Sequence, residues 1–367
     1  MRGHVNRLFA VSALAALLVH SAAAQSRGKF LYGDGKAMFG TLPPDRTVKV
    51  NTGMVQNWTG SFDFNGTTFS YTMVGTDPAL GSASTVVPTQ IIPLIFKFSD
   101  GTVLDPTVAA CGAVKSAVQS AIDSPVFHST DFTPGGTNVG NSQYADAFQR
   151  ANFWSFVSAT APAYHVLLAQ PQVVPPVTIE VPRGLGRTTN GPCAKVGQVN
   201  LSYFSLKLRG LISGIPSTSL PIFLSYNTFF TDRGCCIVGL NTVYGSAPNQ
   251  LTVAVAAYSD AGIFDQPIQD IYGLSRAIGE WMDDPFLTNI VPDWTGGEVV
   301  GCEDLLEVGA PVDGRTFQVT VGGQTYHPSD LVFLPWFEKS YPSRSVNGWY
   351  TFQNNYSGPV MCEDDSR

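Results

Sequence analysis

The chain has 367 residues, of which 44% are hydrophobic and only 13% charged, and its formal net charge at pH 7 is −7. The length fits one large domain or two modest ones. The sequence shows no clustered basic patch, which argues against binding of nucleic-acid phosphates, and the low share of charged residues suits a secreted protein whose polar surface comes from Ser, Thr, Asn, Gln and Gly.

The N-terminus has the order of a secretory signal peptide. Arg2 and Arg7 precede an apolar run over residues 8–19, and small residues lead to a predicted cleavage after Ala24. This run is too short to cross about 30 Å of hydrocarbon, and no later segment is apolar for 18 residues, so we expect no membrane span in the mature chain. Cleavage removes two arginines and no acids, which moves the formal charge from −7 to −9. The sequence therefore predicts a secreted, periplasmic or cell-envelope protein.

All six cysteines lie in the mature chain, and an even number in an exported protein favours disulfides. A zinc–thiolate site is the alternative, and the lack of a C-x-x-C pair disfavours it. Two of the cysteines are adjacent and would point to opposite faces of a strand, so we expect each to bridge a different element. The disulfide candidates are Cys111, Cys193, Cys235, Cys236, Cys302 and Cys362.

The first half of the mature chain alternates between strand and helix patterns. Asn65-Gly66 between two alternating runs predicts a β-hairpin. Residues 87–106 form a second β segment with a turn at Asp100-Gly101. Apolar residues then recur at helical spacing in 105–127 and 141–157. The first of these two predicted helices places Val108, Cys111, Val114, Val118 and Ile122 on one face.

The second half begins with apolar runs that predict strands of a sheet buried on at least one face, in residues 196–208, 219–230, 234–245 and 250–260. A helix is predicted after Pro267, started by Asp265 or Gln266 and stopped by Pro285. Its apolar stripe contains Ile268, Ile271, Leu274, Ile278, and Trp281 or Met282. We then expect an ordered loop over 285–314, a helix in 329–340 and a strand in 346–352.

The helix after Pro267 contains the stretch LSRAIGEWMDDPF, residues 274–286. Together with other segments it resembles a family of secreted bacterial proteins with a zincin-type helix, and more distantly the plant Exordium, or phosphate-induced, proteins. The resemblance covers about residues 50–362. It is carried by SPVFHSTDFTPGGTNVGNSQYADAFQRANFW, LPIFLSYNTFFTDRGCCIVG, AAYSDAGIFDQPIQDI, GCEDLLEVGAP and LPWFEKSYPSRSVNGWYTF.

This resemblance implies a zinc helix of the form H-E-x-x-E, in which residues i and i+4 reach one metal and the glutamate at i+1 acts on the metal-bound water. Here Arg276 stands at the histidine position and Ala277 at the catalytic glutamate position, while Glu280 keeps the i+4 position. Glu307 aligns with a glutamate of the family's LEVGDP segment and Ala310 replaces its aspartate. Glu280 and Glu307 are therefore the candidate metal ligands of a degenerate site.

Two interpretations of Arg276 follow. Its guanidinium can occupy the place of the cation and neutralise Glu280 inside a buried cavity, or the two residues can form an ordinary surface ion pair across one helical turn. Substitute zinc ligands are few, because the mature chain has only His128, His165 and His327, and no two of them are spaced as a helical pair.

The segment from Ala277 to Gly314 contains nine acidic residues and no Lys or Arg. It can ligate calcium or form a solvated acidic rim, and the missing D-x-[DN]-x-[DN]-G pattern favours the rim. The loop GLGRTTNGP, residues 184–192, contains glycines but lacks the Lys-Ser/Thr ending of a phosphate-binding loop.

These observations predict an α+β fold, with a zincin-like mixed sheet and a long motif helix. The expected organisation is a signal peptide over 1–24, a β-rich section over 25–85 and a zincin-like domain over 86–367. The preferred function is non-catalytic binding of a protein or polysaccharide at the cell surface, with no resident cofactor. The ligand would lie in a cleft that once held a substrate. The alternatives are an active metallohydrolase using zinc or calcium around Glu280, and a structural envelope protein.

Overall fold

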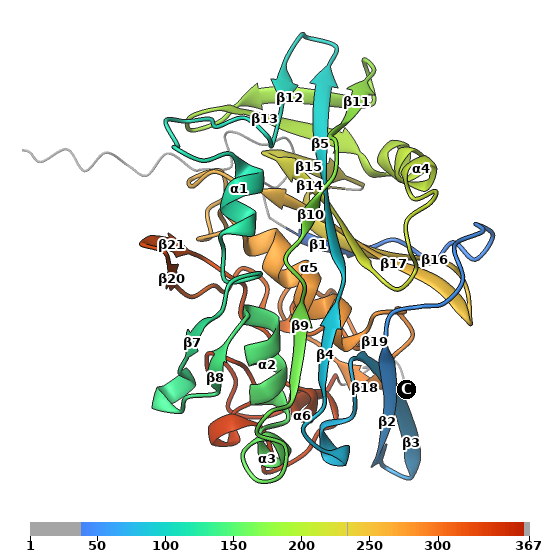
Figure 1. Cartoon of the computed structure of the whole chain (residues 1–367), viewed down its shortest axis with the longest axis vertical. Coiled ribbons are helices and arrows are strands. Elements are labelled where there is room, and N and C mark those ends of the chain that lie inside the picture. Colours follow the sequence, from blue (N-terminus) through green and yellow to red (C-terminus); the bar gives the residue numbers. More distant parts are fainter. Residues whose placement is uncertain (1–37, 233, 363–367) are drawn as a thin grey trace, which may run out of the picture.

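The computed structural model describes residues 38–232 and 234–362. Its largest element is a mixed sheet of eleven strands, which Figure 1 shows as a long curled layer. Three strands pair beside its main path: β1 (Met38–Thr41) with β16, and β6 (Val103–Leu104) and β11 (Val177–Val181) with β5. The main path runs in the order β10 (Gln172–Val173), β5 (Thr89–Phe98), β14 (Leu220–Tyr226), β17 (Asn249–Tyr258), β16 (Cys235–Ser246), β15 (Thr228–Thr231), β13 (Lys195–Asn200) and β12 (Gly186–Asn190).

Five two-stranded sheets surround this layer. They are β2 (Asn57–Phe64) with β3 (Thr67–Val74), β4 (Ser84–Val87) with β9 (His165–Leu168), β7 (Thr130–Phe132) with β8 (Gly140–Ser142), β18 (Ile290–Trp294) with β19 (Glu303–Leu305), and β20 (Val319–Val321) with β21 (Gln324–Tyr326).

Six α-helices accompany the strands in the described part of the chain. They are α1 (Ala117–Ile122), α2 (Tyr144–Asn152), α3 (Trp154–Val157), α4 (Leu201–Leu211), α5 (Tyr272–Asp283) and α6 (Leu334–Phe337). Short 3₁₀ turns are η2 (Pro78–Leu80), η3 (Pro134–Gly136), η4 (Ala310–Val312) and η5 (Val346–Gly348). The combination of helices with a large mixed sheet confirms the α+β class.

Side-chain alternation along the strands gives the sheet two buried faces. In β17, Ala254 and Ala256 belong to the core that contains α2, α5 and α6, whereas Val253 and Val255 belong to the core beneath α4. Phe223 of β14 lies on the α4 side, and its neighbours in the same strand lie on the other. The prediction of a sheet buried on at least one face is confirmed, and the sheet is in fact covered on both.

Several predicted elements are confirmed. The hairpin β2–β3 turns at Asn65-Gly66, where both residues have positive φ. The turn at Asp100-Gly101 joins β5 to β6. The helical pattern over 141–157 forms α2 and α3, which are separated at Phe153.

The predicted helix over 105–127 is wrong for its first half, since only α1 is helical. Cys111 has φ 57° and is bonded to Cys193, which turns the chain away from a helix. Val108 and Val114 are consequently exposed, at 59% and 98%, instead of lying on a buried helical face.

Four other predictions need correction. The segment 285–314, predicted to be a loop, contains the paired strands β18 and β19 and the turn η4. Residues 196–208 are one strand only as far as Asn200, whose side chain accepts a hydrogen bond from the Tyr203 N–H and starts α4. The helix predicted in 329–340 is limited to α6. The predicted strand in 346–352 is the turn η5 followed by a single bridge between Thr351 and Val332. In each case the short apolar run is compatible with a helix, a strand or a turn, and tertiary packing determines which of them forms.

Two cysteine pairs, Cys111–Cys193 and Cys302–Cys362, are placed as disulfides, and the sulfurs of the adjacent Cys235 and Cys236 lie side by side. The Cα atoms of the first two pairs are 5.7 and 5.6 Å apart, within the usual disulfide range. The expectation that each adjacent cysteine bridges a different element is wrong, because the other four cysteines pair among themselves and the two adjacent sulfurs face each other.

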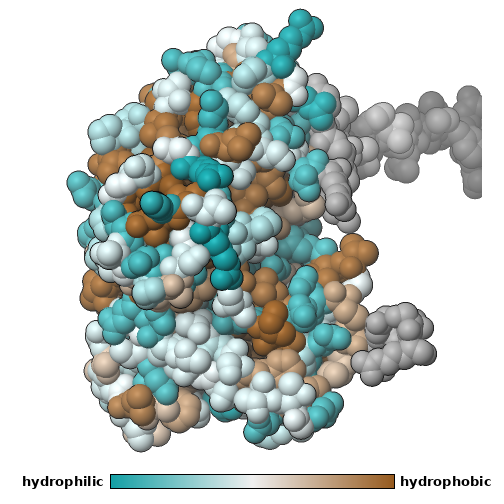
Figure 2. Space-filling view, turned by 90° about the vertical axis from the view of Figure 1, so that its right-hand side faces the viewer, coloured by the Kyte–Doolittle hydropathy of each residue, from teal (hydrophilic) through white to brown (hydrophobic). Residues whose placement is uncertain are grey.

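Within the described residues, no helix is long and apolar enough to cross a membrane. On the face seen in Figure 2, apolar residues are intermixed with polar ones. The two disulfides fit a protein outside the cytoplasm.

Candidate functional site

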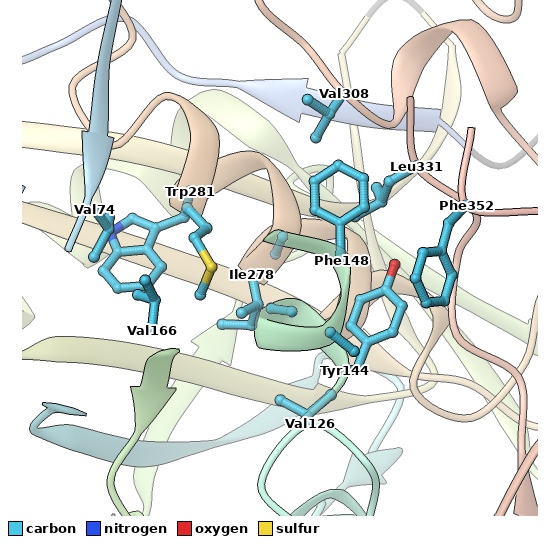
Figure 3. Close-up of a cluster of buried hydrophobic side chains, with 14 of the residues drawn as sticks. Val74, Val126, Tyr144, Phe148, Val166, Ile278, Trp281, Val308, Leu331 and Phe352 are labelled. Carbon is cyan, nitrogen blue, oxygen red and sulfur yellow. The ribbon is translucent and has the colours of Figure 1, made fainter. Parts of the chain in front are cut away.

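Helix α5 lies at the centre of the molecule, against β16 and β17 of the main sheet (Figure 1). All twelve of its residues are buried. Figure 3 shows Ile278 and Trp281 among the side chains of the neighbouring core, and the indole N–H of Trp281 donates to Thr252 Oγ1 at 2.8 Å. The apolar stripe predicted for this helix is confirmed from Leu274 onward.

The ends of α5 differ in how well the sequence predicts them. The helix begins at Tyr272, so Asp265 and Gln266 do not cap it, and Ile268 and Ile271 reach the core from the segment before the helix. It ends at Asp283, two residues before Pro285, as predicted from the missing N–H of proline.

Arg276 is the central residue of the site. Its side chain is 1% exposed. Nη1 donates to Asp313 Oδ1 at 2.7 Å, Nη2 donates to Glu298 Oε1, and Nε lies 3.5 Å from Glu280 Oε1. The guanidinium also lies over the ring of Phe39, with Cζ 4.7 Å from its centroid. The interpretation as a surface ion pair is therefore wrong, because Arg276 and Glu280 are both buried.

The partners of Arg276 are held in place by further hydrogen bonds. The Phe39 N–H donates to Glu298 Oε2 at 3.0 Å, which ties β1 to the acidic segment. The Tyr272 hydroxyl donates to Asp313 Oδ1 at 3.0 Å and accepts from the Gly314 N–H at 2.9 Å. Arg276 thus joins α5, β1 and the segment after β18 through one buried charge network.

Electrostatics keep this arginine charged. Burial opposes its charge, but the neighbouring Glu298, Tyr272 and Asp313 outweigh that effect and raise the pKa of Arg276 well above its usual value. A buried charge needs this compensation, because an isolated ion in a medium of low dielectric is strongly destabilising.

Ala277 lies on a different side of α5. Its methyl group is fully buried in the apolar core, and its carbonyl accepts from Asn241 Nδ2 at 3.0 Å. A glutamate at this position would place a carboxylate in that core. Ala277 thus serves packing and supplies no group that can take a proton from water.

Glu280 and Glu307 are brought close together. Glu280 is 6% exposed, and its Oε1 accepts from the Gly309 N–H at 2.9 Å. Burial raises the pKa of Glu280, while Arg276 opposes the rise. Burial and the charge of Glu280 together raise the pKa of Glu307. The Gly309 N–H that Glu280 binds lies two residues after Glu307, so the two candidate ligands belong to the same region, but Glu280 is already engaged by Arg276 and Gly309.

A metal ion needs more donors than this pair provides, since zinc takes three or four protein ligands and calcium six to eight oxygens. Across residues 38–232 and 234–362, no group of three or more His, Cys, Asp or Glu side chains is arranged to hold one. The residues around Glu280 do not fit zinc or calcium, because a guanidinium without a free lone pair stands among the carboxylates.

The three histidines of the mature chain lie elsewhere. His165 Nδ1 pairs with the buried Asp146 at 2.8 Å, and His327 Nδ1 pairs with Asp270 at 2.7 Å. His128 is exposed. Each of the two paired histidines thus has a carboxylate partner away from Glu280.

The acidic segment divides into buried and exposed parts. Asp293 and Asp304 are exposed, as expected for a solvated rim. Asp283 and Asp284 are buried, and the side chains of Glu298 and Asp313 are only 17% and 10% exposed. The rim interpretation is wrong for these residues. The one signal for their burial in the sequence is that a long acidic stretch without Lys or Arg follows directly after Arg276.

Two buried carboxylates outside the Arg276 network also have raised pKa values. Burial raises the pKa of Asp283 to about 8 and that of Asp284 to about 7. Asp283 Oδ1 accepts from Gln149 Nε2 at 2.9 Å, whereas Oδ2 has no hydrogen-bond partner among the described residues. Asp284 accepts from the backbone N–H groups of Thr288 and Asn289.

An open cleft along α5 is not observed. Every residue of the helix is buried, and five described surface cavities, of 110 to 490 Å³, include no α5 residue in their lining. On this side of α5 the segment with Glu298 and Asp313 covers Arg276, and the substrate cleft expected over the helix is not among these five cavities. Comparisons with protein families, curated proteins and solved structures find no match to this chain.

Proposed function

We propose that the mature chain is an exported, non-catalytic binding protein whose α5 is a zincin-like helix with its metal position taken by Arg276. The observation that carries this proposal is the buried guanidinium, which pairs with Glu298, Asp313 and Glu280. An arginine has no lone pair for a metal and stays protonated, and Ala277 cannot act as a base. The helix then stabilises the fold, and its former cation site is filled from within.

Metal analysis of the purified mature protein tests this proposal. After dialysis without chelator, elemental mass spectrometry should find well under one zinc or calcium per chain, and an assay with unfolded casein should detect no peptidase activity. One tightly held zinc per chain would overturn the proposal in favour of the altered metallohydrolase around Glu280.

The zincin-like ancestry has its own test. Arg276→His restores a ligand four residues before Glu280, the spacing that places two ligands on one helical face. We expect this variant to gain zinc affinity, measured by competition with a fluorescent chelator. Arg276→Gln is the matched control, since it removes the same charge without adding an imidazole. Equal zinc affinity in the two variants would argue against a zincin-like site.

Export is the remaining part of the proposal. The disulfide pairs Cys111–Cys193 and Cys302–Cys362 support an oxidising compartment. N-terminal sequencing of the secreted or envelope fraction should find a chain beginning at Gln25. A chain retained in the cytoplasm with Met1 would contradict it.

A further inference from the structure

The largest of five described cavities, about 490 Å³, lies far from the charged network of α5. It is formed where the β5–β6 turn, the loop before β12 and the ends of β13 and β15 meet, near the top of Figure 1. Its volume falls within the usual range of small-molecule sites. Residues 184–188 form one wall. The segment 184–192, predicted to be a loop, is mostly strand β12.

Two arginines give this cavity a charge opposite to that of the whole chain. Arg183 and Arg187 line it, and Asp100 is the one acidic residue of the lining. The Asp100 carboxylate is already engaged, because Oδ1 accepts from the Thr102 N–H at 2.9 Å and Oδ2 accepts from the Thr188 hydroxyl. The lining therefore carries one excess positive charge in a protein whose formal charge is −7. A singly charged anion suits it better than a polyanion, which Asp100 would repel.

The floor of the cavity holds one of these arginines in position. Gln198 is 2% exposed, and its Oε1 accepts from Arg187 Nε at 3.3 Å. On its other side the Gln198 amide contacts the sulfurs of Cys235 and Cys236. Arg187 is itself exposed, and its hydrogen bond to this buried amide holds the Nε edge of the guanidinium. A guanidinium held in this way can recognise a planar carboxylate.

The rest of the lining combines hydrogen-bonding groups with apolar surface. Asn200 offers its side-chain NH₂, because its oxygen accepts from the Tyr203 N–H. The hydroxyls of Thr188 and Thr231 donate to Asp100 and to the Val199 carbonyl, so they face a ligand as acceptors. Phe98 and Leu185 supply apolar contact. A sugar presents hydroxyl groups at its edge and C–H groups on its faces, so it matches this mixture, and a carboxylate on the sugar matches the arginines. Small-molecule sites commonly combine apolar walls with a few placed polar groups in this way.

We propose that this cavity binds a carboxylated sugar unit, such as a uronic acid residue of an extracellular polysaccharide. The proposal rests on the proposed binding function and names its ligand class. It does not depend on the chemistry at α5, because no α5 residue lines the cavity. The metal analysis and the binding experiment below can therefore fail separately.

The test is isothermal titration of the mature protein with a galacturonate trisaccharide, a neutral galactose trisaccharide and inorganic phosphate. We expect saturable binding of the galacturonate, at least tenfold weaker binding of the neutral sugar, and weakening of galacturonate binding as salt rises. Equal affinity for both sugars, no saturable binding of either, or binding of phosphate alone would overturn the proposal.

Variants connect the binding to the cavity. Arg183→Gln with Arg187→Gln should weaken galacturonate binding at least tenfold. Arg209→Gln is the matched control and should bind normally, because Arg209 is a half-exposed arginine that pairs with Asp45 outside this cavity. If the double variant fails to fold, Arg183→Gln alone is the test. Arg183 is exposed, so this variant should fold, and it should weaken galacturonate binding about threefold or more. Normal binding by the charge variants would overturn the proposal.

Discussion

Arg276→Met is the substitution that most directly tests the buried charge network. Methionine keeps much of the side-chain length and removes the charge, which leaves Glu298, Asp313 and Glu280 without their cation. Hydrogen bonds to charged groups contribute about 1.5–3 kcal/mol each, and Arg276 donates two of them, to Asp313 and Glu298. Breaking a buried pair by removing one partner costs about 3–5 kcal/mol. We expect a loss in this range, a large part of a typical stability of about 5–15 kcal/mol.

The loss can be measured by urea unfolding at pH 7.5, followed by tryptophan fluorescence and extrapolated to water. Arg209→Met is the matched control, because the Arg209 side chain is 51% exposed in its pair with Asp45. Exposed pairs contribute about 0–1 kcal/mol, so this variant should unfold almost as the wild type does.

A combined variant separates lost charge balance from lost packing. Adding Glu298→Gln and Asp313→Asn to Arg276→Met removes the two carboxylates that the arginine neutralises, and neutral replacements of a whole buried set are often tolerated. We expect this triple variant to regain most of the stability that Arg276→Met loses. A single variant that loses less than about 1 kcal/mol, or a triple variant no more stable than the single one, would refute the reasoning.

Three further predictions concern neighbouring features. Asp283→Asn should flatten the pH dependence of the free energy of unfolding, because burial raises the pKa of Asp283 in the folded state to about 8. In the wild type, the protonated Asp283 stabilises the fold fully below about pH 4, and this contribution is lost as the pH rises through about 8, by at most roughly 1.4 kcal/mol per pH unit. Chemical unfolding between pH 5 and 9 measures the difference. A parallel slope in the variant and the wild type would count against this assignment. Gly309→Ala should lose about 1–3 kcal/mol in urea unfolding, because an added Cβ would lie 2.6 Å from Arg276 Nε; no loss would mean that the arginine can move. Replacing both Cys302 and Cys362 by serine removes a disulfide between residues 60 positions apart. By the chain-entropy relation, this should lower the free energy of unfolding by about 4 kcal/mol. Thermal unfolding with and without reductant can check it, and an unchanged melting temperature would contradict it.

The sequence by itself determined the features that depend on neighbouring residues. The Asn65-Gly66 turn, the apolar face of α5 and its end before Pro285 follow from local backbone and side-chain preferences. That Arg276 has no lone pair for a metal and that Ala277 cannot accept a proton is equally local, because it is a property of the side chains themselves.

Only the tertiary structure decided what Arg276 does instead. Its partners Glu298 and Asp313 lie 22 and 37 residues away, and no periodic pattern connects positions so far apart. The same holds for the cysteine pairs, whose partners sequence spacing cannot select, and for the acidic segment, which is half buried because it folds over α5. Local periodicity reports which face of an element is apolar, whereas the course of the loops determines which charges that element meets.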